Sequence, residues 1–241
     1  MIGGNNPGST QKCENEKYDG TSWTEKSDLN TARSQAGSGG TTAAAVYFGG
    51  DVYPTSPRDT GATEEWNGSA WSNNPNSMGT ARRALIGMGT QTAALAAGGI
   101  NPAGGQVANV EEYDGSSWTA QNTMPAATES LAGGGTQTAG LTFGGYAPDY
   151  TATTAEYDGT NWTAGGSLGT ARWGMGRGTV GSQTACLGFG GDTGSVTGVT
   201  EGYDGTAWST RPSMGSARRA AGGAGTTTAN LAAGGYTSTI V

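Results

Sequence analysis

The chain has 241 residues with a formal net charge of −7; 46 residues are Gly, 13% are charged and 34% are hydrophobic. This length suits one sizeable all-β domain, and the acidic balance argues against nucleic acid as a partner. The absence of His removes the commonest general base and the commonest transition-metal ligand. No apolar run approaches the roughly 20 residues of a membrane span, and the first residues lack the basic and apolar regions of a signal peptide.

Four short strands are expected in each repeat, and residues 80–118 show them in chain order. Residues 81–89 are rich in Gly, residues 92–99 form an apolar run of small side chains ending in a Gly pair, and residues 107–114 alternate as a half-exposed strand does. A fourth strand begins around Trp118. Gly-Thr-Gln and Asp-Gly between these pieces are typical of tight turns. Such a meander is the blade of a propeller, with almost no helix.

The pattern Tyr-Asp-Gly-x-x-Trp, with Trp-Asn-Gly once, organises the whole chain. Its aromatic pairs are Tyr18 and Trp23, Trp66 and Trp71, Tyr113 and Trp118, Tyr157 and Trp162, and Tyr203 and Trp208. Subtracting the Trp numbers gives spacings of 48, 47, 44 and 46 residues. A period of this length indicates a repeat architecture, and the regular aromatics argue against the disorder that so much Gly would otherwise allow.

Six Gly pairs accompany these five aromatic pairs, so the repeats are offset from the ends of the sequence. Residues 16–24 are expected to supply the outer strands of a blade whose inner strands come from residues 217–235. The sequence therefore predicts an all-β, five-bladed propeller of four-stranded antiparallel blades, closed where these N-terminal outer strands pair with the C-terminal inner strands. Residues 14–241 would form this single domain. Residues 1–13 would be a redundant, flexible segment that overlaps in role with the C-terminal tail, so that one of the two is displaced.

Most repeated side chains are interpreted as structural. The aromatic pairs are expected to wedge between neighbouring sheets, and the Asp of each Asp-Gly to form a turn rather than bind Ca²⁺. Arg33, Arg82, Arg172 and Arg218 recur before the inner strands, with Glu129 taken as the odd member in the third repeat. They are expected to pair with backbone carbonyls or with carboxylates such as Glu64, Glu111 and Glu201 and to fix neighbouring blades, although a ring of Arg could instead hold an anion. Cys13 and Cys186 occupy non-equivalent positions and are read as incidental.

The connections that vary between repeats are better candidates for function. They follow the Gly pairs at residues 51–62, 100–109, 146–153 and 192–199, and they emerge on the same face as the links between blades. Variation on one face of a rigid scaffold is where binding usually resides. The aromatic and charged members of these connections, predicted as ligand-binding residues, are Tyr53, Arg58, Tyr146, Asp149, Tyr150, Asp192 and Tyr236.

The Gly pair, the Tyr, the Trp and the words Met-x-x-Ala-Arg together resemble a compact kelch repeat. Glu-Tyr-Asp-Gly-x-x-Trp and Thr-Ala-Arg are also similar to Gly-rich repeats of marine bacteriophage structural proteins. The five-blade count and repeat length are similar to those of tachylectin-type lectins. Asp-Gly-x-x-Trp is similar to the sialidase Asp-box, which spaces Asp and Gly one residue further apart. The resemblances imply a propeller that binds, on a virion or an extracellular surface.

The sequence predicts no catalytic residue, metal or cofactor, because it offers no nucleophile with a base and no metal-ligand constellation. The first hypothesis is a non-enzymatic binding or structural module, a phage virion appendage that recognises host-surface glycan or another virion protein, within a larger assembly and without membrane insertion. The alternative is a soluble five-bladed lectin with sugar pockets repeated between its blades. A glycan-cleaving enzyme on the same scaffold is the least favoured hypothesis.

Overall fold

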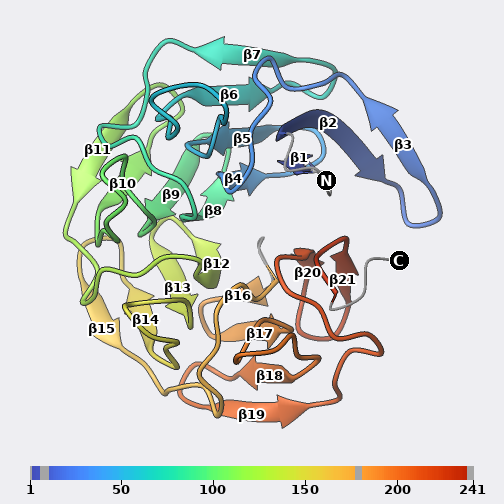
Figure 1. The fold of residues 1–241 in the computed structure, drawn as a ribbon, viewed down its shortest axis with the longest axis vertical. Helices are drawn as coiled ribbons and strands as arrows, with labels where there is room; N and C mark the ends of the chain where they lie inside the picture. The colour runs from blue at the N-terminus through green and yellow to red at the C-terminus, as the bar shows by residue number, and fades with distance from the viewer. Residues whose placement is uncertain (1, 6–10, 177–180, 238–241) are drawn as a thin grey trace.

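The chain folds as an all-β, five-bladed β-propeller of antiparallel blades (Figure 1), seen in a computed structural model that describes residues 2–5, 11–176 and 181–237. These residues form strands and turns, and none of them is helical. The Gly-rich strands β4, β8, β12, β16 and β20 lie nearest the axis in Figure 1, and β3, β7, β11, β15 and β19 form the rim. Gly suits the inner strands because it permits close backbone approach.

Four blades are complete meanders of neighbouring strands in chain order. Blade I comprises β4 (Gly37–Gly40), β5 (Ala45–Phe48), β6 (Thr63–Trp66) and β7 (Trp71–Asn74). Blade II comprises β8 (Ile86–Thr90), β9 (Ala93–Ala97), β10 (Val110–Tyr113) and β11 (Trp118–Gln121). Blade III comprises β12 (Ala132–Thr136), β13 (Ala139–Phe143), β14 (Thr154–Tyr157) and β15 (Trp162–Ala164). Blade IV comprises β16 (Gly181–Ser182), β17 (Ala185–Phe189), β18 (Thr200–Tyr203) and β19 (Trp208–Arg211).

The strands of the fifth blade come from both ends of the sequence and lie in two sheets. The inner pair is β20 (Gly222–Gly225) and β21 (Asn230–Ala233), and the outer sheet is β1 (Ile2–Asn5), β2 (Gln11–Tyr18) and β3 (Trp23–Lys26). Figure 1 shows a gap between the two parts. The predicted pairing of the N-terminal outer strands with the C-terminal inner strands is therefore wrong in its hydrogen bonding, since β2 and β21 are not neighbours in any sheet of the described residues.

The reason is that β1 occupies the edge of β2. Ile2 lies opposite Asn15 as Ala97 lies opposite Val110 in blade II, so β1 takes the register of a second strand. Gly3 and Gly4 adopt φ angles of 59° and 122°, like the other Gly pairs. The N-terminal copy of the Gly pair thus takes the place along β2 that the sequence assigned to the C-terminal copy. The expected domain boundary at residue 14 falls inside β2, and residues 238–241 lie outside the described residues.

A chain of backbone hydrogen bonds links the five inner strands around the axis. One residue in the segment that leads into each inner strand is left-handed, with φ between 53° and 60° at Gln35, Ala84, Ser130, Gly174 and Ala220. Each of the last four donates its N–H to the carbonyl of the preceding member, at 2.8, 2.8, 3.2 and 2.6 Å. A left-handed non-Gly residue costs roughly 1–2 kcal/mol. Its recurrence shows that the bonds around the axis impose this conformation.

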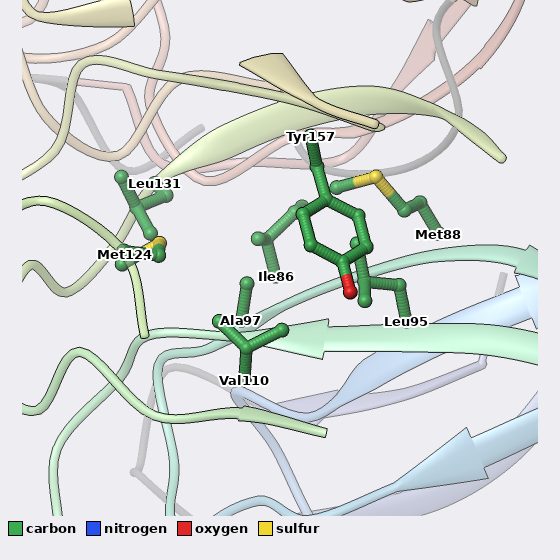
Figure 2. Packing of buried hydrophobic residues seen from close by; sticks show 8 residues of the cluster. All are labelled: Ile86, Met88, Leu95, Ala97, Val110, Met124, Leu131 and Tyr157. Atoms are coloured by element: carbon green, nitrogen blue, oxygen red, sulfur yellow. The ribbon is translucent and has the colours of Figure 1, made fainter. Parts of the chain in front are cut away.

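The repeated Tyr and Trp pack between blades, as predicted. Figure 2 shows Tyr157 of blade III beside Met88 and Leu95 of blade II, in one buried cluster. The Tyr157 hydroxyl donates to Glu112 of blade II at 3.0 Å, and Tyr113 bonds Glu65 of blade I in the same way. The Tyr of blades II, III and IV therefore joins its blade to the preceding one by both apolar and polar contacts, since Tyr203 also bonds Glu156 of blade III.

The Asp of each repeat forms a turn. Asp114 Oδ1 accepts from the N–H groups of Ser116 and Ser117, both at 2.8 Å, and Asn67 Oδ1 does the same for Ser69 and Ala70 at 2.9 Å. These hydrogen bonds to the charged form lower the Asp114 pKa to about 2. The carboxylate is fully used within its own hairpin, which supports the turn interpretation.

The repeated Arg residues are buried in ion pairs with the repeated Glu residues. Arg33 Nη2 lies 3.0 Å from Glu64 Oε1, and the other two pairs are Arg82 with Glu111 and Arg172 with Glu201. Each Arg follows the link that leads into its blade, and each Glu lies on the third strand of the same blade. The pairs therefore tie each link to its own blade; the expectation that they fix neighbouring blades is wrong. The fourth Arg, Arg218, donates to Gly234 O at 2.7 Å.

Glu129 is not the odd member of this set. Arg82 follows Met78 by four positions and Arg172 follows Leu168 by four, and the residue four positions after Met124 is Thr128. Glu129 is equivalent to Arg83, at a position that varies between repeats. The expectation for Glu129 is therefore wrong, because the third repeat has Thr at the Arg position and places its charged residue one position later.

Candidate binding face

The Gly pairs position the variable connections. Gly50 donates to the Arg82 carbonyl of the next link at 2.9 Å. A Cβ on the neighbouring Gly49, whose φ is 67°, would lie 2.8 Å from the same carbonyl oxygen. The first five of the six pairs thus dock the end of a second strand against the following link, where only Gly fits. The connections after the pairs and the links between blades form one end of the propeller, here called the loop face.

Isolated β-bridges bring residues of the loop face together near the axis. The residue before each left-handed position pairs with the residue after each Gly pair. The axial ring is defined as these ten residues: Ser34 with Asp51, Arg83 with Ile100, Glu129 with Tyr146, Trp173 with Asp192, and Arg219 with Tyr236. The ring contains three aromatic side chains and five charged ones, and no two of its pairs are alike.

Around blade I the ring is built from ion pairs. Arg83 Nη1 lies 2.6 and 2.8 Å from the two carboxylate oxygens of Asp59, and Arg58 pairs with Asp51. The Arg58 guanidinium also lies 5.8 Å from the centre of the Tyr53 ring. Burial disfavours the charged form of Asp51, but hydrogen bonds from Arg58 and from the Tyr53 N–H outweigh burial and hold the Asp51 pKa below its usual value.

Between blades IV and V an aromatic clamp holds a cation. The Arg219 guanidinium lies 4.9 Å from the ring centres of both Trp173 and Tyr236, and its Nε lies 3.7 Å from Asp192 Oδ2. Half of the Tyr236 side chain remains exposed. Stacking preorganises the guanidinium, which leaves its edge available for a planar acceptor.

Blade III adds an aromatic pair. The rings of Tyr146 and Tyr150 meet edge to face with their centres 6.1 Å apart. Beside them, Gln106 Nε2 donates to Glu129 at 3.5 Å. Asp149 lies at the exposed tip of the same connection, where its carboxylate accepts the N–H of Tyr150 at 2.7 Å.

The structure places all seven predicted ligand-binding residues on the loop face. Asp192, Tyr146 and Tyr236 belong to the axial ring, Tyr53, Arg58 and Tyr150 contact it or its neighbours, and Asp149 points outward at a loop tip. Sequence reasoning missed Arg83, Trp173 and Arg219. The signal for them was that the position after the repeated Arg varies between repeats, with four residue types in five repeats, which is the same argument that identified the loops.

The arrangement offers stacking surfaces and charged hydrogen-bonding groups. Within residues 2–5, 11–176 and 181–237, no three acidic or Cys side chains gather as a metal site requires. In the same ranges, no helix of the length and hydrophobicity of a membrane span is present. Cys13 and Cys186 form no disulfide within the part of the chain that the structure describes.

No family model matches the chain, and no curated protein matches it in sequence. Among solved structures, that of YjhT aligns over 93% of this chain and 84% of its own, with a TM-score of 0.77 and 13% identical residues. At this identity the likeness shows the fold alone, and it supports the propeller architecture. The resemblances to kelch, bacteriophage and tachylectin-type repeats remain predictions from the sequence.

Proposed function

We propose that this protein is a non-enzymatic binding module that uses its loop face to recognise a glycan or a protein on a cell or virion surface. The observation that carries the proposal is the axial ring, where aromatic side chains and ion-paired charges from all five blades meet on a rigid scaffold. Exposed tyrosines beside Arg side chains held by ion pairs and stacking are typical of recognition surfaces. The role that we favour is that of a phage virion appendage within a larger assembly.

The differences among the ring positions favour one composite site over a lectin with five equal pockets. A lectin of the latter kind would repeat its contact residues from blade to blade, whereas the ring has Ser34, Arg83, Glu129, Trp173 and Arg219 at equivalent places. A single ligand spanning several blades would contact different chemistry on each side. This fits an extended or branched partner better than a monosaccharide.

The test is a glycan array combined with binding of the full chain to intact bacterial cells and to purified virion proteins. Variants Tyr53→Ala and Tyr236→Ala remove exposed rings of the loop face, and each should weaken binding about tenfold or more. Thr206→Ala, in a turn at the opposite end of blade IV, is the matched control and should bind normally. If the chain binds no glycan, cell or virion protein, the recognition role is wrong. If Thr206→Ala weakens binding as much as the tyrosine variants, the loop face is the wrong surface.

A further inference from the structure

Blade III lacks both halves of the buried ion pair that blades I, II and IV contain. Thr128 occupies the position of Arg82, and Ala155 occupies the position of Glu111, two residues before the Tyr of the repeat. Losing only one partner would leave a buried charge without a counter-ion, which is costly; losing both avoids that cost. The double replacement removes most of two long side chains from the interior of the blade.

In the other blades the pair supplies donors to a strand and acceptors to a link. Arg82 Nη2 donates to the Ala96 carbonyl at 3.4 Å, and Arg172 Nη2 donates to the Gly188 carbonyl at 3.4 Å. The carboxylate accepts in return from the link: Glu111 accepts the N–H groups of Gly79 and Thr80 at 2.5 and 3.3 Å. The guanidinium therefore supplies a donor to the second-strand carbonyl, and the carboxylate supplies acceptors to the N–H groups of the link.

Blade III compensates only in part. Thr128 Oγ1 donates to the Ala126 carbonyl at 3.2 Å, which replaces the bond from Arg82 Nη1 to the Thr80 carbonyl at 3.2 Å. Pro125 stands where Gly79 stands in blade II, so one of the link donors is removed along with its acceptor. The second-strand carbonyl equivalent to that of Ala96 belongs to Thr142.

What remains is a cavity of about 170 Å³. Its apolar wall includes Met124, Pro125 and Leu131, and its polar wall includes Thr128, Thr142 and Ser167. A water molecule takes about 30 Å³ of liquid, so the cavity holds a group of several heavy atoms. Blades I, II and IV fill the equivalent space with their own Arg and Glu side chains.

The side chains that line the cavity favour binding of a neutral group over a charged one. No charged side chain lines the cavity, so a bound cation would lack the carboxylate that accompanies Arg82, and a bound anion would lack a counter-ion. A group that reproduced the contacts of the ion pair would donate toward the Thr142 carbonyl and accept from the remaining N–H of the link. A carboxamide does both without net charge, since its NH₂ donates and its carbonyl accepts.

We propose that the blade III cavity is a subsite for a carboxamide group on a short apolar stem. The cavity lies on the loop face, beside the connection that carries Tyr146 and Tyr150. The subsite deepens the proposed binding function, on which its biological use rests, but its occupancy is measured separately from recognition of a whole partner. An amide-bearing ligand would insert this one group while the rest of it lies over the loop face.

The test compares three probes of similar size by protein-observed NMR: butyramide, butyrate and propylguanidinium. Butyramide should give saturable shifts confined to the Thr128, Leu131 and Ala155 signals, with an affinity at least about tenfold higher than that of either charged probe. Equal affinities for the three probes, or no saturable shift with butyramide, would overturn the assignment.

The variant pair Thr128→Arg with Ala155→Glu rebuilds in blade III the ion pair of its neighbours and should abolish butyramide binding with an unchanged fold. Because that double variant introduces buried charges, Ala155→Leu provides a second, uncharged way to fill the cavity. Thr160→Ala, in the outer turn of the same blade, is the control and should bind butyramide as the parent chain does. Retention of binding in both filled variants contradicts the site. Loss of glycan or protein recognition with butyramide binding intact contradicts only the proposed function.

Discussion

Trp118 Nε1 donates to Thr63 Oγ1 of the preceding blade at 2.9 Å, and Trp208 Nε1 donates to the equivalent Thr154 Oγ1 at 2.9 Å. The indole rings also pack against Phe48 and Phe143, with ring centres 4.7 and 4.6 Å apart. The Trp side chain thus makes both a polar and an apolar contact with the preceding blade. It is the contact by which blades II and IV hold blades I and III.

Blade IV has the equivalent Thr, Thr200, but no Trp side chain of the described residues packs against it. Thr200 Oγ1 is buried and has no hydrogen-bond partner in the structure, and a cavity of about 180 Å³ is lined by Phe189, Thr200 and Met214. Thr63→Val and Thr154→Val should each cost about 1–3 kcal/mol of the free energy of unfolding, since each leaves a Trp N–H unsatisfied. Thr200→Val should cost nothing or stabilise slightly.

Urea denaturation of the three variants checks this prediction. They are matched because each replaces the first residue of a third strand by an isosteric apolar side chain. If Thr200→Val destabilises as much as Thr63→Val, then Thr200 has a partner in solution, and Trp23 is the indole at the equivalent position of the fifth blade.

The buried ion pairs predict strong coupling. Arg82→Thr alone leaves Glu111 buried without a counter-ion and should cost about 3–5 kcal/mol of the free energy of unfolding. Arg82→Thr combined with Glu111→Ala reproduces the pair of residues found in blade III and should cost less than Arg82→Thr alone. A double-mutant cycle by chemical denaturation measures the difference. Additive costs would show that the two side chains act independently, contrary to their contact.

The left-handed residues before the inner strands predict a gain from Gly. Ala84→Gly and Ser130→Gly should raise the free energy of unfolding by up to about 1 kcal/mol, because relief of the left-handed conformation exceeds the entropic cost of Gly. Gly174 already occupies the equivalent position in blade IV. The control is Ala96→Gly in the middle of β9, which should lower stability by roughly 0.5–1 kcal/mol. Thermal melts of the three variants decide the point, and a loss in Ala84→Gly equal to that of the control contradicts it.

The turn aspartates predict an acid-labile contribution to stability. Hydrogen bonds from the Ser117 and Ser116 N–H groups lower the Asp114 pKa to about 2, and equivalent bonds lower the pKa of Asp19, Asp158 and Asp204. Because the folded pKa lies below the unfolded value near 3.8, the stabilisation is present above about pH 4 and is lost as the pH falls toward 2.

Replacing these four aspartates by Asn should preserve the turns, as Asn67 does in blade I, while removing their titration. The variant should lose less stability than the parent chain between pH 4 and pH 2, as measured by denaturation at several pH values. A parallel decline in the two proteins would place the acid sensitivity elsewhere, for example in the buried Glu residues.

The architecture followed from the sequence because the repeat marks every strand with a local signal: Asp-Gly for one turn, Gly pairs for another, aromatic pairs for the wedge. The loop-face residues could be predicted because their positions hold different residues in different repeats, on a scaffold that is otherwise repeated. The pairing partner of β2 could not be predicted, because two copies of the Gly pair compete for one edge and no local pattern ranks them. The blade III cavity was missed because it consists of two substitutions 27 positions apart, Thr128 and Ala155, which meet only in the folded blade.

The division of the fifth blade into two sheets has a consequence for tryptophan fluorescence. Trp23 is 42% exposed, whereas Trp71, at the equivalent position of blade I, is 6% exposed. An indole in water emits at longer wavelength and is quenched by small solutes, and one in a packed core is shielded from both effects. Trp23 therefore serves as a native fluorescent reporter on the outer sheet of the fifth blade, and a blue shift of its emission would register any partner that covers it.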